Sequence, residues 1–277
     1  MTKARINRFL DRLVFYLVAS AIVLAFALPL VWMLVASLRT PGLAPPRGVE
    51  WLPQPLSWSN YPALFKLLPL GRYFLNSLIL CGLAVGFTLL IASWAGFGMA
   101  QLGRRARRWL LLLSIGILMA PLMVVWLARY VLIARLGLVD SYLGLLAPAL
   151  MGSSPLFVLL FYWGFRRMPV ELFEAARLEG AAPLSIWRRV AMPLARPTTA
   201  TVAVLTFILY WNDFINPLIY LKSQSLYTLA IGLQQLQQLD RTNWPLLLAA
   251  ALVMTLPVVL LFIITQRYYL QDYSSGS

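Results

Sequence analysis

The residue types that most often perform chemistry in proteins are scarce in this chain. It has no histidine, and Cys81 is its only cysteine, so neither an internal disulfide nor a Cys/His metal site is expected. A G-x-x-x-x-G-K-[ST] phosphate-binding loop is missing, and no serine stands in a G-x-S-x-G elbow. The chain is therefore not expected to be an enzyme or to hold a cofactor or metal, and a nucleotide would have to bind to another chain.

One polar stretch, about residues 166–197, has a regular layout. Pro169 predicts the start of a short helix, and Gly180 ends it as a C-cap glycine would. Pro183 predicts the start of a second short helix, so the stretch forms two helices with a corner between them. This corner is either a docking surface for a soluble partner or an amphipathic loop on the lipid surface. Three apolar residues share a face of the second helix and two prolines end the stretch: Ile186, Trp187, Val190, Pro193 and Pro197.

Asp213 is the one acid inside an expected membrane span. Burying a charge there is costly, so such an acid marks a water-filled path or a paired partner. Trp211, Asn212 and Asn216 surround it, and sugars are bound by aromatic faces and amide or carboxylate groups of this kind. The alternative, which stays open, is that Asp213 lies near the outer interface and caps a helix broken at Pro217.

Long apolar blocks must position these residues. The chain is 61% hydrophobic and 12% charged, whereas a soluble domain carries about 25% charged residues. The blocks predict an all-α membrane protein, and the net charge of +14 is assigned to basic loops rather than to nucleic-acid binding. We expect one transmembrane domain over residues 1–277, with six spans at about 13–37, 76–102, 109–133, 142–165, 198–221 and 244–265.

The first span, the connection that follows it and the second span each carry a local pattern. The basic start and the run after Leu13 resemble a signal peptide, but the run is long enough to be an uncleaved first span. Prolines recur in 38–75 and exclude a long helix there, leaving room for a short interfacial helix near Tyr61–Leu68. Four glycines of the second span either allow close helix packing or are ordinary membrane glycines: Gly82, Gly86, Gly96 and Gly98.

Basic residues give the orientation. The N-terminal tail, the cluster at 104–108, the stretch 166–197 and the C-terminal tail together hold 15 Lys and Arg, against 8 in the remaining loops. By the positive-inside rule, the first side is cytoplasmic and both termini lie there. Arg129 and Arg135 then lie near the outer interface, where they snorkel or contact a substrate.

The polar stretch carries a resemblance to a known family. Glu174-Ala175-Ala176 is followed after three residues by Gly180, and after nine more by Val190, one residue and Met192-Pro193. This spacing resembles the EAA motif of ABC importer permeases, in which isoleucine and leucine stand where this chain has Val190 and Met192.

The resemblance covers about residues 13–270 and points to the carbohydrate-uptake permeases, in particular the maltose-type second subunit. The tail departs from it, because Gln271-Asp272-Tyr273 replaces a glycine-rich end. The segments that carry the resemblance are Asn76-Ser77-Leu78, Leu136-Gly137-Leu138, Trp211-Asn212-Asp213-Phe214 and Gln266-Arg267-Tyr268.

The resemblance implies a type I ABC importer permease fold with cytoplasmic coupling helices, in a bacterial inner membrane. It implies a heterodimer with a second permease subunit, an ATPase subunit dimer that holds ATP and Mg²⁺, and an external solute-binding protein. The transported solute would be a sugar, a polyol or glycerol phosphate. ATPase coupling is then expected at Glu174, Ala175, Ala176, Gly180 and Pro193, and the substrate path at Asn76, Trp211, Asn212, Asp213 and Asn216.

Other functional classes fit less well. A secondary transporter without an ATPase partner usually has internal repeats and several intramembrane ionisable residues, and here only Asp213 qualifies. A membrane enzyme would need a cluster of His, Asp or Ser at one depth, and the lack of histidine argues against that class. A fifth span without charge would have favoured a purely structural subunit, and Asp213 argues against that class.

Overall fold

The computed structural model describes residues 3–41, 48, 51, 53–150, 154–239 and 242–274, with side chains except for 3–11, 122–124 and 267–274. Every regular element within that part of the chain is a helix. Contacts divide the chain into two compact units, Met1–Pro69 with Leu233–Leu256, and Leu70–Gly232 with Pro257–Ser277. Predicted loop residues such as Arg47 and Arg241 lie outside the described residues.

In the first unit, helix α1 (Lys3–Ser37) contains the predicted first span, and α2 (Asn60–Leu67) is the predicted short interfacial helix. The side-chain amide of Asn60 is fully buried and donates hydrogen bonds to the carbonyl oxygens of Ser37 at 2.8 Å and Arg39 at 2.7 Å. These bonds satisfy two carbonyl groups at the end of α1, where the helix has no partners of its own. They hold the start of α2 beside that end.

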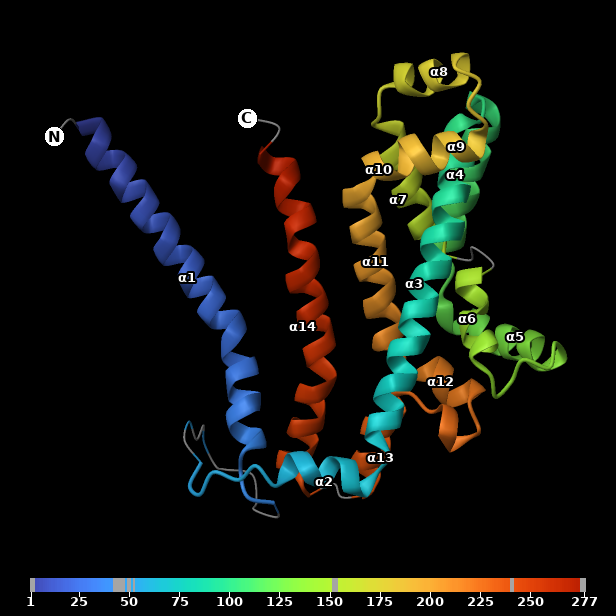
Figure 1. Cartoon of the computed structure of the whole chain (residues 1–277). Helices are drawn as coiled ribbons and strands as arrows, with labels where there is room; N and C mark the ends of the chain where they lie inside the picture. The colour runs from blue at the N-terminus through green and yellow to red at the C-terminus, as the bar shows by residue number, and fades with distance from the viewer. Residues whose placement is uncertain are drawn as a thin grey trace. The chain divides into compact units, whose positions relative to one another are not determined.

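The second unit is organised around three helices that lie side by side, α3 (Leu70–Gln101), α7 (Pro155–Arg166) and α11 (Arg196–Trp211) (Figure 1). Helices α3 and α7 approach closely at Gly96, where an added Cβ would lie 2.7 Å from Cβ of Phe161 and 2.8 Å from the backbone N of Tyr162. The other three glycines raised by the sequence, Gly82, Gly86 and Gly98, would meet no atom within 4 Å. Only Gly96 of these four is therefore a packing glycine.

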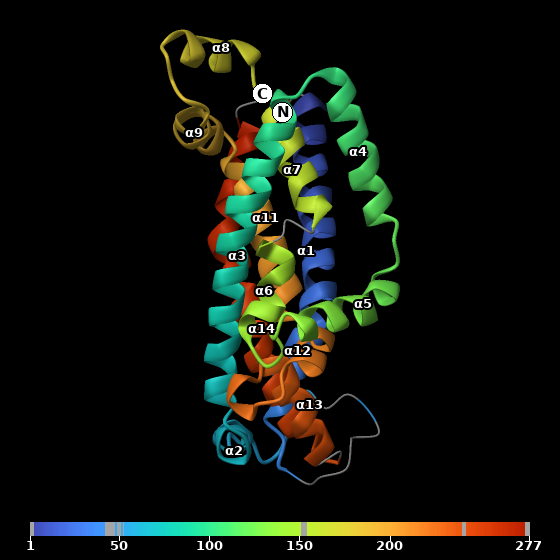
Figure 2. The same cartoon turned by 90° about the vertical axis from the view of Figure 1, so that its right-hand side faces the viewer.

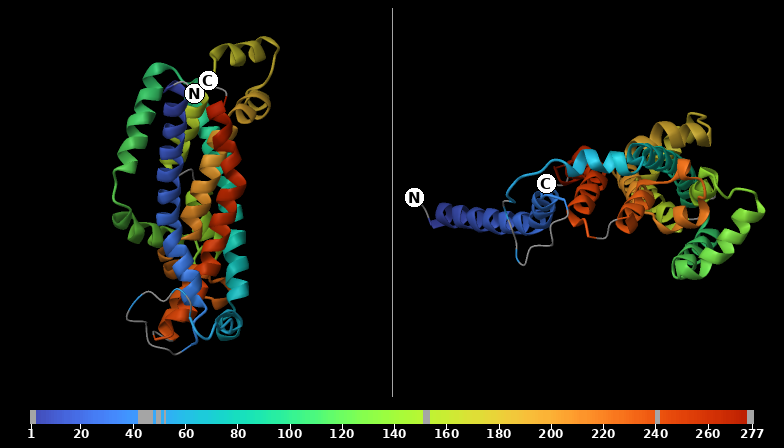
Figure 3. Two further views of the ribbon diagram at one scale, coloured as in Figure 1. Left: turned by 90° about the vertical axis from the view of Figure 1, so that its left-hand side faces the viewer. Right: turned by 90° about the horizontal axis from the view of Figure 1, so that it is seen from below.

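The predicted third span is wrong as a single helix. It is divided into α4 (Arg104–Leu118) and α5 (Leu122–Arg135), because Pro121 lacks an N–H and its ring disfavours helix in the residue before it. Helix α4 runs back along the bundle on the side of α3 opposite to α8 (Val170–Leu178) and leads into α5 (Figures 2 and 3). The predicted fifth span is also divided, into α11 and α12 (Ile215–Tyr220).

The first, second and sixth predicted spans lie in long helices, and the fourth corresponds to two shorter ones. Four stretches of the described residues are long and apolar enough to cross a membrane: Arg12–Ser37, Leu70–Gln101, Tyr142–Arg166 and Trp244–Gln266. The third of these comprises α6 (Tyr142–Leu150) and α7, on either side of residues 151–153, which lie outside the described part. The last stretch lies in α14 (Trp244–Ser274), preceded by α13 (Leu229–Leu239).

The predicted count of six spans is not confirmed. The bent pair Pro183–Leu194 and Arg196–Trp211 brings the number of candidate spans to five if it is taken as one. Helix α4 has 15 residues and α5 has 14, so each alone falls short of the roughly 20 residues that a span needs.

A carboxylate fixes the loop after α5 to the loop after α12. Asp140, at φ 59°, accepts hydrogen bonds from the backbone N–H groups of Lys222 at 2.9 Å and Ser223 at 2.8 Å, and from the Ser223 hydroxyl. Its own N–H donates to the carbonyl oxygen of Tyr220 at 2.8 Å. These donors, the Ser223 hydroxyl first, stabilise the ionised form and lower the pKa of Asp140 below its ordinary value of 3.8.

We expect Gly96→Ala to destabilise the second unit by about 1–3 kcal/mol, because the methyl group would overlap the backbone of α7. The measurement is the thermal unfolding midpoint of the purified chain in detergent. Gly86→Ala is the matched control on the same helix, since its methyl group enters open space. Equal midpoints for the two variants would contradict close packing at Gly96.

We expect the loop connection at Asp140 to weaken in acid. Its pKa is lower in the folded protein than in the unfolded chain, so its contribution to stability is complete above the ordinary carboxyl pKa and is lost as the pH falls through the folded value. Hydrogen exchange at the amides of Lys222 and Ser223 measures this loss. Asp140→Asn should exchange faster than the wild type at neutral pH, and the difference should shrink in acid. An unchanged exchange rate in the variant at neutral pH would contradict the bond.

Candidate functional site

Gly180 forms the corner that the sequence predicts. Helix α8 ends at Leu178, and Gly180 has φ +80°, a conformation that glycine adopts without strain. The Gly180 N–H donates to the carbonyl oxygen of Arg177 at 2.9 Å, and the Ala181 N–H donates to that of Ala176 at 3.0 Å. This pair of bonds is a Schellman motif, which satisfies two carbonyl groups at the helix end. The predicted C-cap at Gly180 is confirmed.

The second part of the coupling segment, as we name residues 166–197, is longer than predicted. Helix α9 (Pro183–Ile186) continues through the π-turn η1 (Trp187–Ala191) into α10 (Met192–Leu194). The direction then changes by 83° into α11. Pro197 lies in the first turn of α11, where a missing N–H has no cost, so it marks the end of the segment as expected. The expectation is wrong for Pro193, which lies within α10.

Aromatic rings hold the inner face of the coupling segment on the bundle. The Phe97 ring of α3 lies 5.7 Å from that of Phe165 on α7 and 6.2 Å from that of Phe173 on α8, between ring centroids. Trp187 of η1 stacks on Trp94 of α3 at 5.2 Å. Ile186 is buried in the same cluster, against which Trp187 and Val190 pack, so the predicted shared face is confirmed.

The rest of the coupling segment is open to its surroundings. It projects beyond one end of the α3, α7 and α11 bundle (Figure 1). Of the motif residues, Ala176 is half-buried, and Glu174, Ala175, Gly180 and Pro193 are exposed. Leu178 is 90% exposed, and Leu184 and Leu194 are each about half exposed. Polar and apolar residues exposed together on a segment outside the bundle can form a contact surface for another protein.

Asp213 lies between α11 and α12, at the end of α11 away from the coupling segment, and Asn216 lies in the first turn of α12 (Figure 1). The Asp213 carboxylate accepts hydrogen bonds from the backbone N–H of Asn216 at 3.2 Å and from its side-chain amide at 2.8 Å. Asp213 therefore caps the start of α12, as one of the two sequence interpretations proposed. The helix break lies at 212–214, and Pro217 lies inside α12 rather than at the break.

The other candidates for the substrate path have partners within the fold. Trp211 is 1% exposed and packs between Phe74 at 5.7 Å and Phe207 at 5.4 Å. The Asn76 amide donates to the carbonyl oxygens of Ser225 and Tyr227, each at 2.9 Å. The exposed Asn212 donates to the carbonyl oxygen of Ile208 at 3.0 Å. The structure thus brings Asp213 and Asn216 together and gives Asn76 and Trp211 structural contacts, and a substrate role for these residues stays a prediction.

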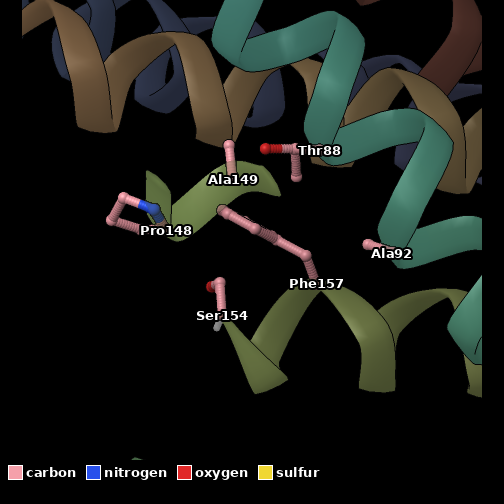
Figure 4. Close-up of a pocket in the computed structure, with 6 residues that line it drawn as sticks. All are labelled: Thr88, Ala92, Pro148, Ala149, Ser154 and Phe157. Carbon is pink, nitrogen blue, oxygen red and sulfur yellow. The ribbon is translucent and has the colours of Figure 1, made fainter. Parts of the chain in front are cut away.

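A small cavity lies among α3, α6 and α7, with the Phe157 side chain extending across it toward Pro148 and Ala149 (Figure 4). Thr88 and Ser154 contribute hydroxyl groups to its wall. Its volume of about 10 Å³ is enough for about one water molecule and far too small for a sugar. Among the described residues, no three His, Cys, Asp or Glu side chains lie close enough to hold a metal ion.

Sequence analysis missed the residues that position the coupling segment. Phe97 and Trp94 lie in a continuous apolar block, where no periodic pattern separates a residue that packs on the segment from one that faces lipid. Asp140 was missed as well, although an isolated acid in a loop beside a glycine-leucine turn could have suggested a loop connection.

Comparisons with known proteins agree with this architecture. The arabinooligosaccharides transport system permease protein AraQ of Bacillus subtilis is 32% identical over 81% of this chain and 79% of its own length. The melibiose/raffinose/stachyose import permease protein MelC of the same organism is 29% identical over 94% of each chain. A crystal structure of a bacterial ABC transporter involved in the import of the acidic polysaccharide alginate has the same fold, with a TM-score of 0.74, 19% identity and coverage of 97% of this chain and 99% of that one.

A family profile covers the coupling segment and the helices around it. It matches residues 89–274, which include the end of α3, the Gly180 corner and the Asp213 cap. Together with the identity to AraQ, this match places the chain in the family: it belongs to the binding-protein-dependent transport system inner membrane components, the permeases of ABC transporters.

Proposed function

We propose that this chain is one permease subunit of an ATP-driven importer and that the coupling segment docks on a separate ATPase subunit. The observation that carries the proposal is the two-sided coupling segment. Its inner side contacts α3 and α7 through Phe97, Phe165 and Phe173, while Glu174 and Leu178 are exposed. A segment held by the membrane helices and open toward a soluble partner can pass movement from one to the other.

The EAA spacing supports the assignment of roles within this segment. Glu174 would meet a basic or polar group on the ATPase, and exposed Leu178 and Leu184 would enter an apolar cleft. Gly180 would keep the corner between the two helices. Ala175, Ala176 and Pro193 would complete the contact surface. ATP and Mg²⁺ would bind to the ATPase dimer and not to this chain.

The assembly that we propose has further members. A second permease subunit would pair with this one to form the path, and an external solute-binding protein would deliver the solute to the outer face. The excess of 15 basic residues against 8 supports a cytoplasmic coupling segment and cytoplasmic termini in a bacterial inner membrane.

The solute that we propose is an oligosaccharide or a related sugar compound. The permeases AraQ and MelC, which are named for oligosaccharide transport, support this class. Asp213, Asn212 and Asn216 offer carboxylate and amide groups for sugar hydroxyls at one end of the bundle. Asp213 is half-buried there, so it can cap α12 and still contact a solute in the path.

Affinity purification of the tagged chain from mildly solubilised membranes tests the proposal. Mass spectrometry of the purified material should identify a second permease and an ATPase in fixed proportion to this chain. Recovery of the chain alone, with a non-hydrolysable ATP analogue present, would favour a secondary transporter and contradict ATPase coupling.

We expect Glu174→Lys to weaken the affinity of the ATPase for the permease by about tenfold or more, because it replaces an exposed acid of the docking surface with a base. The measurement is the amount of ATPase that co-purifies with the variant, together with solute uptake. Membrane insertion should be unchanged.

Glu171→Lys is the matched control, since it makes the same charge change one turn earlier on α8 and outside the motif. Normal ATPase recovery and normal uptake in the Glu174 variant would contradict the assignment of Glu174 to the docking surface. Equal losses in both variants would point to net charge rather than to a specific contact.

A further inference from the structure

A cavity of about 510 Å³ lies between the coupling segment and the last turns of α3, beside the aromatic contacts that join them. Trp94, Phe97 and Gly98 form its wall on α3, and Pro183 and Ile186 form its wall on α9. The volume lies within the range of about 300–1,000 Å³ that is typical of small-molecule sites. These walls are apolar, so the interior suits a hydrocarbon group.

Two polar side chains that line this cavity, Arg177 and Gln101, carry hydrogen-bond donors. Arg177 of α8 donates a hydrogen bond to the side-chain oxygen of Gln101 at the end of α3, and both residues line the cavity. A guanidinium carries five N–H donors, and this bond uses one of them, while the Gln101 amide adds two more. None of the described residues that line the cavity is acidic. An anionic group would therefore find several donors and no repulsion from its walls.

The cavity lies at the C-terminal end of α3, the helix end that a run of basic residues follows. Gln101 is the last residue of α3, and a basic cluster opens α4 three residues later, at Arg104, Arg105, Arg107 and Arg108. The coupling segment itself holds six arginines and three glutamates. Basic residues at the end of membrane helices attract anionic lipids, and basic pockets between helices bind their headgroups.

We propose that this cavity binds one anionic phospholipid of the leaflet next to the basic cluster. An acyl chain would lie against Trp94 and Phe97, and the phosphate would accept hydrogen bonds from Arg177 and Gln101. The lipid would fill the space between α3 and the coupling segment. This assignment does not rest on the ATPase partner, because every residue that carries it belongs to this chain.

The glycines at the wall allow the cavity to be closed selectively. A Cβ added at Gly98 would meet no atom within 4 Å, so a larger side chain there enters the cavity without displacing backbone. Gly82 lies on the same helix, is also free of atoms within 4 Å and does not line the cavity. Gly98→Leu therefore blocks the site, and Gly82→Leu is its matched control.

Native mass spectrometry of the full-length chain, purified in detergent and stripped of lipid, tests the proposal by titration with phosphatidylglycerol. The wild type and Gly82→Leu should bind one phosphatidylglycerol more tightly than phosphatidylcholine, and Gly98→Leu should lose this binding. Arg177→Gln should weaken it about fivefold, the equivalent of about 1 kcal/mol per basic residue near a lipid surface. This exposed substitution keeps the test independent of any packing defect at Gly98.

Three results would overturn the proposal. The first is equal binding of phosphatidylglycerol and phosphatidylcholine by the wild type, which would remove the role of charge. The second is equal phosphatidylglycerol binding by the Gly98 and Gly82 variants, which would place the lipid elsewhere. The third is displacement of the lipid by free glycerol phosphate, which would identify a site for a small phosphorylated solute rather than for a lipid.

Discussion

Phe97 joins three helices of the second unit, and the place of the coupling segment depends on it. Its ring contacts Phe165 on α7 and Phe173 on α8, while the neighbouring Gly96 lets the backbones of α3 and α7 approach. Hydrophobic burial does little to bring helices together in lipid, so close packing must do so. Aromatic pairs add about 0.5–1.5 kcal/mol each to that packing. The aromatic cluster therefore extends the membrane bundle to a helix outside it.

This arrangement makes the coupling segment suitable for mechanical coupling. The Schellman bonds at Gly180 define its corner at the end of α8, and its second part packs on α3 through the Trp94–Trp187 stack. A force applied to the exposed side would thus act on α3 and α7 together. Trp94 and Phe97, which pack on the segment, also line the cavity. A lipid bound there would therefore change the strength of the packing between the segment and α3.

Polar side chains account for the interruptions of the helices at the opposite end of the same unit. Backbone groups at membrane depth must find partners within the protein or in a water-filled cavity. Asp213 supplies such a partner to the backbone N–H of Asn216 where α11 stops and α12 begins, and the Asn216 side-chain amide holds the carboxylate in place. Outside the spans, Asp140 accepts hydrogen bonds in the same way from the backbone of the loop that follows α12. The acid inside the predicted fifth span has a structural role at the break, and the same position leaves it half-buried beside the proposed path.

The amino-acid sequence by itself determined the helical membrane class, the family and the Gly180 corner. Long apolar blocks and a glycine after a short helix are local patterns, and each has one main physical interpretation. The EAA spacing indicated the family through its resemblance to known permeases. Only the tertiary structure decided that Gly96 rather than Gly82, Gly86 or Gly98 packs against α7, that Asn76 and Trp211 are engaged within the fold, and that the third and fifth predicted spans are divided. In an all-apolar block every face of a helix looks alike, so the face that meets a neighbour depends on contacts with residues far along the chain.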